Sequence, residues 1–300
     1  MSAKQWCSRL CSKERVTVSE IAIVTDSTSD IPRELAEKYG VSVVPLSVVH
    51  EGVIYRDGVD LTPEQFYPML EKAKDLPTTS QPSPSQFIEV FKPLIESGKQ
   101  VLSFHISRVL SGTANSARLA AEQVAAGRIH VVDSGTVSYG IAAQAIEAAR
   151  LAMQGLSASA ILERISRLKD HTKVLFSLST LDYAYKGGRI GKFSSLLGNL
   201  LNIKPIAYIQ DGEYVIIRKV RSMKQVIAGM LDFLVDIFGE RKVRLAVGHT
   251  QALDVAKMLL EQAVELLNVA DEPVLFEIGP VVGTYAGPGA VGICVHPVEY

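Results

Sequence analysis

Cysteine is scarce in this sequence, which limits the cross-links and metal sites that it can form. Its 300 residues include three cysteines, Cys7, Cys11 and Cys294. The Cys-x3-Cys pair near the N-terminus has no second pair of ligands, so its spacing favours neither a disulfide framework nor a zinc site. We interpret the polar residues 1–18 as a mobile N-terminal extension, and we expect no metal site.

An excess of charge of either sign and long hydrophobic runs are also missing. Lys and Arg total 31 against 32 Asp and Glu, and no basic run interleaved with aromatic residues occurs, which argues against nucleic-acid binding. No apolar run is long enough to span a bilayer, and the N-terminus lacks the apolar core of a signal peptide. With 47% hydrophobic residues, the sequence predicts a globular protein with a large core, and the cytoplasm is its expected location.

A self-contained catalytic set is missing as well. The aspartates are scattered, and no Gly-x-Ser-x-Gly nucleophile elbow is present. His105, His249 and His296 lie in or beside apolar stretches, where a hydrogen-bonded structural role is expected. The glycine-rich segments 181–192 and 283–292 fail the spacing or the strand-to-helix context of nucleotide-binding loops. We therefore expect no catalytic residue and no cofactor.

What is present is an alternation of strands and helices that predicts an α/β fold with two domains. IAIVTD predicts a strand, PRELAEKYG a helix that ends at Gly40, and VSVVPLSVVH a second strand. This βαβ beginning predicts a mostly parallel sheet with helices on both faces, over residues 19–170. After His171, six apolar segments and an Asp211-Gly212 hairpin turn predict a mixed sheet over residues 171–300, with helices at about 180–186, 192–201, 222–238 and 251–268.

Two hydroxyl-rich segments indicate an anion-binding site. VLSFHISRVLSGTANSARL predicts a strand followed by a helix whose first turn holds Ser111, Gly112 and Thr113. The first N–H groups of a helix lack partners within the helix and attract anions, although Ser111 could instead only cap its own helix. The second segment is TTS at 78–80, where flanking prolines favour an extended backbone.

Six motifs in register, from about Ile21 to the C-terminus, resemble those of the DegV family of fatty-acid-binding proteins. They are TDSTSD at 25–30, TTSQPS at 78–83, LSGTANSA at 110–117, VVDS at 131–134, LDYAYKGGRIGK at 181–192 and GTYAGPGA at 283–290. The resemblance implies two α/β domains with a long-chain fatty acid such as palmitate in a tunnel between them. It also implies that Thr79 and Ser111 bind the carboxylate.

The resemblance further implies a partner. DegV proteins of the fatty-acid kinase B-subunit type present the acyl carboxylate to a kinase catalytic subunit, which forms the acyl phosphate used in phospholipid metabolism. Transient contact with a membrane surface is compatible with that role. The resemblance marks Ser80, Gly112, Thr113, Arg189 and Tyr285 as secondary site or partner contacts.

Tyr285 is a departure from the family pattern. Family members commonly carry a histidine two residues before the Gly-Pro-Gly turn, where this chain has Tyr285. A phenol donates one hydrogen bond but does not become cationic near neutral pH. A charge-assisted role at this position therefore does not carry over from the family.

Two other hypotheses come from different functional classes. The first is a small-molecule hydrolase with Ser111 as nucleophile and His249 as base, although no motif places the two side chains together. The second is a regulatory or purely structural module, which would have a filled core between its domains and no tunnel.

Overall fold

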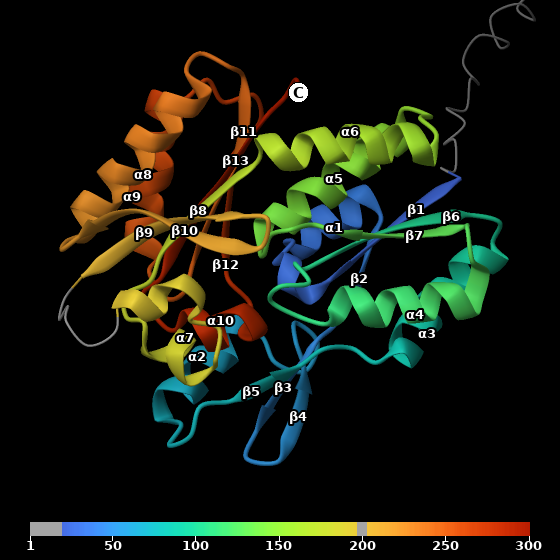
Figure 1. Cartoon of the computed structure of the whole chain (residues 1–300), viewed down its shortest axis with the longest axis horizontal. Helices are drawn as coiled ribbons and strands as arrows, with labels where there is room; N and C mark the ends of the chain where they lie inside the picture. Colours follow the sequence, from blue (N-terminus) through green and yellow to red (C-terminus); the bar gives the residue numbers. More distant parts are fainter. Residues whose placement is uncertain (1–19, 197–202) are drawn as a thin grey trace, which may run out of the picture.

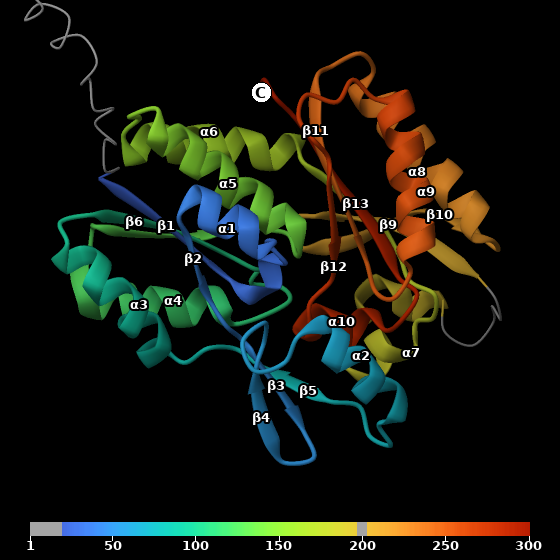
Figure 2. The same cartoon turned by 180° about the vertical axis from the view of Figure 1, so that it is seen from behind.

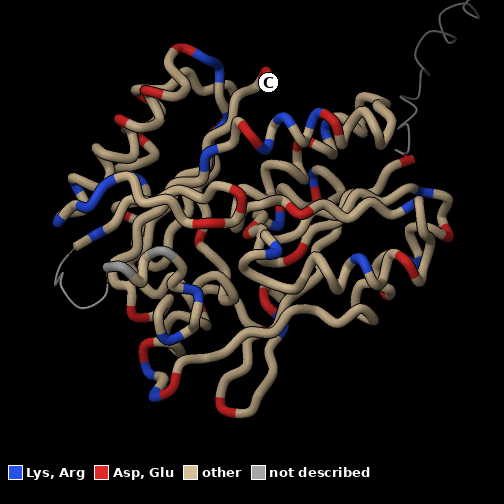
Figure 3. Tube along the Cα trace, viewed as in Figure 1, with Lys and Arg blue, Asp and Glu red and all other residues tan. Residues whose placement is uncertain are grey.

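The computed structural model describes residues 20–196 and 203–300. The predicted N-terminal extension, with Cys7 and Cys11, lies outside these residues. Two sheets and their helices lie side by side, and a small third sheet lies below them (Figure 1). Basic and acidic residues are interspersed over both halves of the molecule (Figure 3), as the near-zero net charge suggests. No helix within the described ranges is long and apolar enough to cross a membrane.

The first sheet is parallel throughout and has the strand order β2-β1-β6-β7. Its strands are β1 (Ile21–Asp26), β2 (Val41–Val44), β6 (Gln100–His105) and β7 (Ile129–Asp133). Successive residues of β1 contact opposite layers: Ile23 packs in the cluster with Ile141 of α5, and Val24 in the cluster with Phe87 of α3. One layer holds α1 (Arg33–Tyr39), α5 (Tyr139–Met153) and α6 (Ala158–His171); the other holds α3 (Pro84–Glu96) and α4 (Thr113–Ala125). The predicted parallel sheet with helices on both faces is confirmed.

One predicted strand of this region is wrong. VSVVPLSVVH does not form a single strand, because β2 ends at Val44 and a new strand, β3 (Ser47–His50), begins after Pro45 and Leu46. Proline cannot donate a hydrogen bond to a strand ladder, and the chain leaves the parallel sheet there. β3 is the central strand of a small antiparallel sheet with β4 (Val53–Arg56) and β5 (Thr78–Ser80). The chain continues from β4 into α2 (Pro63–Lys72), which also lies below the larger sheets (Figure 2).

The second large sheet has six strands in the order β10-β9-β8-β13-β11-β12. They are β8 (Lys173–Ser177), β9 (Lys204–Gln210), β10 (Glu213–Val220), β11 (Val243–His249), β12 (Val274–Glu277) and β13 (Val291–Pro297). Only the β11–β12 pairing among these is parallel, so the predicted mixed sheet is confirmed. Helices α8 (Met223–Phe238) and α9 (Leu253–Leu266) cover one face, and α5 packs on the other. The division into residues 19–170 and 171–300 stays a prediction.

The short helices beside this sheet differ from expectation. α7 (Asp182–Lys186) forms where a helix was predicted. The predicted helix at 192–201 begins as a 3-10 turn, η2 (Gly191–Leu196), and its remainder falls outside the described residues. The first half of the segment GTYAGPGA belongs to a helix, α10 (Pro280–Ala286), which the sequence did not predict, and a turn begins at Gly287 with a φ of 66°.

Candidate functional site

A cavity with a volume of about 390 Å³ lies between the two large sheets. From β1 the chain passes through α1 to β2 on one side, whereas β6 lies on the other side of β1. The loops at the carboxyl ends of β1 and β6 therefore diverge, which is where open α/β sheets bind ligands. Thr28, in the 3-10 turn η1 (Ser27–Ser29) after β1, and Ile106, directly after β6, both line the cavity.

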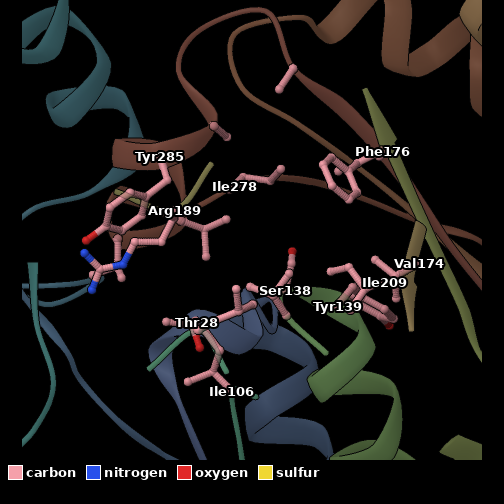
Figure 4. Close-up of a pocket in the computed structure, with 18 of the residues that line it drawn as sticks. Thr28, Ile106, Ser138, Tyr139, Val174, Phe176, Arg189, Ile209, Ile278 and Tyr285 are labelled. Atoms are coloured by element: carbon pink, nitrogen blue, oxygen red, sulfur yellow. The ribbon is translucent and has the colours of Figure 1, made fainter. Parts of the chain in front are cut away.

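Apolar side chains from the second sheet form most of the cavity wall. They include Val174 and Phe176 of β8, Ile209 of β9, Phe276 of β12 and Ile293 of β13. Figure 4 shows Phe176, Val174 and Ile209 together on the side of the cavity opposite Tyr285 and Arg189. A volume of this size with apolar walls and a few polar groups is typical of a small-molecule site.

The polar side of the cavity brings together three segments that are distant in sequence. Thr79 Oγ1 on β5 lies 2.5 Å from the Tyr285 hydroxyl oxygen on α10. The Arg189 guanidinium lies over the Tyr285 ring, 4.9 Å from its centroid. Gly187 allows this arrangement, because a Cβ there would lie 2.5 Å from Cδ1 of the Tyr285 ring. Thr79, Tyr285 and Arg189 thus form one group.

Ser111 lies at the start of α4 and lines the same cavity. Its Oγ is 2.9 Å from Thr113 Oγ1 and accepts a hydrogen bond from the Thr113 N–H at 3.3 Å. Ser111 therefore both accepts a hydrogen bond from the first turn of α4 and lines the cavity. Gln81 joins this turn to the TTS segment. It lies against the Cα of Gly112, where a Cβ would overlap it, and it donates a hydrogen bond to Ser116 Oγ at 3.0 Å.

The structure places most of the expected site residues around the cavity. Those that line it are Thr79, Ser80, Ser111, Gly112, Arg189 and Tyr285. Thr113 is fully buried behind Ser111 and is not among the lining residues. Sequence reasoning missed the polar lining residues Thr28, Gln81 and Ser138. Thr28 and Gln81 lie within the quoted motifs TDSTSD and TTSQPS, which were the available signal.

The residues of the hydrolase hypothesis do not form a nucleophile and base pair. His249 is not among the described residues that line the cavity. Its Nδ1 lies 4.0 Å from Glu277 Oε1, and burial lowers its pKa. Because the hydrogen bonds of Ser111 go to Thr113, the structure gives this hypothesis no support.

A buried polar network supports the loops below the cavity. His105 Nδ1 lies 2.9 Å from Asp26 Oδ2, and His105 Nε2 lies 2.6 Å from Ser103 Oγ. Asp26 also accepts hydrogen bonds from the Thr28 and Ile106 N–H groups, at 3.0 and 3.1 Å. The connectivity resembles a serine-histidine-aspartate triad, but Ser103 is fully buried and does not line the cavity. The network therefore positions the loops after β1 and β6, and the structural role expected for His105 is confirmed.

Two carboxyl groups, the half-buried Asp30 and the buried Asp57, attach α10 to the first half of the chain. Asp30 accepts hydrogen bonds from the Gly279 N–H at 2.9 Å and from Ser138 Oγ at 2.5 Å. Asp57 accepts from the Val281 N–H and the Ser27 side chain. Burial raises the pKa of Asp30 from 3.8 to about 8, and that of Asp57 to about 7. Both carboxyls thus lie at the start of the helix that carries Tyr285.

No group of three or more His, Cys, Asp or Glu side chains within residues 20–196 and 203–300 is placed to hold a metal ion. The candidate site therefore consists of hydroxyl, amide and guanidinium groups beside an apolar cavity. Such donors suit an anionic group attached to an apolar body.

Comparison with known proteins identifies the family. The family described as "Uncharacterised protein, DegV family" matches residues 20–298. A DegV domain-containing protein of Caldanaerobacter subterraneus subsp. tengcongensis is 37% identical over 92% of this chain and 98% of its own length. A DegV family protein from Thermus thermophilus, described as binding fatty acid, has 35% identity and a TM-score of 0.88, over 93% of this chain and 99% of its own. The fatty-acid-binding DegV of Bacillus subtilis has 31% identity and a TM-score of 0.84, over 92% of this chain and 99% of its own. With its fold, its motifs and these matches in agreement, the chain belongs to the DegV family.

Proposed function

We propose that this protein binds a long-chain fatty acid such as palmitate. In this proposal the carboxylate of the fatty acid lies among Thr79, Ser111 and Tyr285, and the acyl chain lies against the apolar wall of the cavity. The observation that carries the proposal is the division of one cavity into a hydroxyl-rich side and an apolar side. The fatty-acid-binding relatives from Thermus thermophilus and Bacillus subtilis support it.

Burial of the acyl chain supplies most of the binding free energy. Palmitate has about fifteen methylene-sized groups, each worth about 0.8 kcal/mol on burial, so the gross gain is about 12 kcal/mol before the costs of association. The head group then selects for an acid, because hydrogen bonds to a charged group contribute about 1.5–3 kcal/mol each. The apolar wall can therefore retain the acyl chain, and the few polar groups can favour the acid over its ester.

The Thr79–Tyr285 pair is suited to a carboxylate. In a pair of hydroxyls, one donates to the other, and the second O–H proton stays free to donate to a carboxylate oxygen. Ser111 and the backbone N–H of Gly112 can approach the same anion from another loop, because both residues line the cavity. Neutral donors of this kind retain their hydrogen-bonding capacity throughout the physiological pH range.

Extraction of the bound lipid tests this function. We expect the full-length protein, purified from cells and denatured in organic solvent, to release a long-chain fatty acid in near-stoichiometric amount, measured by mass spectrometry. A preparation that releases no fatty acid, and that also fails to bind added palmitate or oleate, would contradict the proposal.

The protein further serves, in this proposal, as the non-catalytic subunit that presents the acyl carboxylate to a fatty-acid kinase. Support comes from the exposure of the polar side: Ser80, Gln81, Gly112 and Arg189 are exposed, whereas apolar wall residues such as Val174 and Ile209 are buried. A phosphoryl donor can thus approach the head group while the acyl chain stays covered. Arg189 offers a cation beside that head group for a phosphate or an acidic partner surface.

The variant Arg189→Gln tests the role of this cation. We expect palmitate affinity to change by less than about threefold, since an exposed charge is well screened. We expect acyl phosphate formation, measured with ATP and a bacterial fatty-acid kinase catalytic subunit, to fall more than about tenfold. Lys186→Gln is the matched control, because Lys186 is an exposed cation on α7 outside the cavity lining. Equal losses in the two variants would exclude a specific role for Arg189.

A further inference from the structure

The fatty-acid cavity shares a wall with a second cleft. This cleft has a volume of about 630 Å³ and is lined by residues of α1, α5, β11, β12 and β13. Two described residues, Tyr139 and Cys294, line both spaces. They therefore separate the apolar cavity from the second cleft, and neither belongs to the proposed carboxylate site.

Tyr139 lies far from the proposed carboxylate position. It belongs to the first turn of α5, where it is buried in a cluster with Val174, Ile209 and Cys294. Its ring centroid lies 5.4 Å from that of Phe276. Figure 4 shows Tyr139 beside Val174 and Ile209, on the side of the cavity away from Arg189 and Tyr285. Tyr139 thus lies on the side of the cavity away from the residues proposed to bind the carboxylate.

The two sides of this wall differ in chemistry. The second cleft contains an ion-pair network in which Asp271 Oδ2 lies 2.6 Å from Arg244 Nε and 3.2 Å from Arg150 Nη2. Glu147 extends it, with Oε2 3.4 Å from Arg244 Nη1. Burial raises the pKa of Tyr139, the neighbouring Cys294 raises it further, and the positive charge of Arg150 lowers it. A tyrosine suits such a boundary, because its ring covers apolar surface while its hydroxyl faces polar groups.

We infer that Tyr139, with Cys294 beside it, sets the longest acyl chain that the protein binds. The inference rests on the proposed fatty-acid binding and adds the residues that determine chain length. A methylene group beyond this limit would have to displace a buried ring that is packed against Phe276. Without the ring, the added methylenes could enter the second cleft beside Ala143, Ile146 and Val274, which line it.

Competition among saturated acids tests the inference in the full-length protein. Myristate, palmitate, stearate and arachidate are offered together, and the bound acids are quantified by mass spectrometry. In Tyr139→Ala and Tyr139→Leu, we expect the ratio of bound arachidate to palmitate to rise about tenfold, as burial of additional methylenes predicts. Tyr139→Phe should keep the wild-type ratio because it keeps the ring. Leu35→Ala, which alters the second cleft only, should also keep it.

The outcomes separate this inference from the function on which it rests. An unchanged ratio in the folded Tyr139→Leu and Tyr139→Ala variants would overturn the role of Tyr139 while leaving fatty-acid binding intact. If Tyr139→Ala does not fold, Tyr139→Leu decides, since it keeps an apolar side chain in the cluster. A wild-type protein that binds none of the four acids would instead contradict the proposed function.

Discussion

The variant Thr79→Val/Ser111→Ala is expected to bind palmitate about a hundredfold to a thousandfold more weakly than the wild type. Each replacement removes a hydroxyl from the polar side of the cavity. Hydrogen bonds to a carboxylate contribute about 1.5–3 kcal/mol each, and about 1.4 kcal/mol corresponds to a tenfold change in affinity. Tyr285 and the N–H groups at the start of α4 stay in place, so the loss is smaller than the sum of two full bonds. Titration calorimetry with palmitate measures it.

Two controls distinguish loss of head-group recognition from damage to the cavity. Thr78→Val makes the same chemical change one residue away, on an exposed side chain of β5 that does not line the cavity. It should leave palmitate affinity unchanged. Methyl palmitate keeps the acyl chain but lacks the charge, so the double variant should bind it as well as the wild type does. Equal weakening for acid and ester would refute the assignment of Thr79 and Ser111 to the carboxylate.

The free energy of unfolding is expected to fall by several kcal/mol from about pH 5 to about pH 8, through Asp30 and Asp57. Burial raises their pKa values from 3.8 to about 8 and about 7. A group whose folded pKa is raised keeps its proton in the folded state after losing it in the unfolded state. Its stabilising contribution is complete below pH 3.8 and is lost as the pH rises through the folded pKa. Urea denaturation at a series of pH values measures this slope.

Asp30→Asn should reduce that pH dependence. The amide oxygen can still accept the Gly279 hydrogen bond, but the side chain no longer titrates, so stability above about pH 7 should exceed that of the wild type. Asp60→Asn is the control, because the exposed Asp60 bonds to Arg56 and its pKa is lowered to about 2. Its effect should be the same at pH 5 and pH 8. A wild-type stability that stays constant or rises across this range would contradict the protonation of these carboxyls in the folded protein.

Local patterns in the sequence were sufficient for most elements of both large sheets. β1, α1 and the turn at Gly40 follow from an apolar run, a helical segment and a left-handed glycine with a φ of 62°. The Asp211-Gly212 hairpin follows in the same way, with φ values of 52° and 81°. Each of these elements is determined by residues within a few positions of one another, so it can be predicted from the local sequence.

Elements that depend on distant partners were missed. β4 was not predicted from the sequence, because its strand character comes from pairing with β3. α10 contains Gly283 and the β-branched residues Val281, Val282 and Thr284, a poor helical sequence. Asp30 and Asp57 accept hydrogen bonds from the N–H groups of Gly279 and Val281 at its start. Because these stabilising groups lie more than two hundred residues away in the chain, no local pattern reveals the helix.

By itself, the sequence determined the α/β class, the parallel and mixed sheets, and, through its motifs, the family and the identity of Thr79 and Ser111 as candidates. Only the tertiary structure decided that Thr79 meets Tyr285, that Thr113 lies behind Ser111 outside the cavity, and that Tyr139 and Cys294 separate two cavities. The physical reason is that periodicity and turn chemistry act over a few residues, whereas a cavity wall is made by side chains whose proximity depends on how the sheets pack.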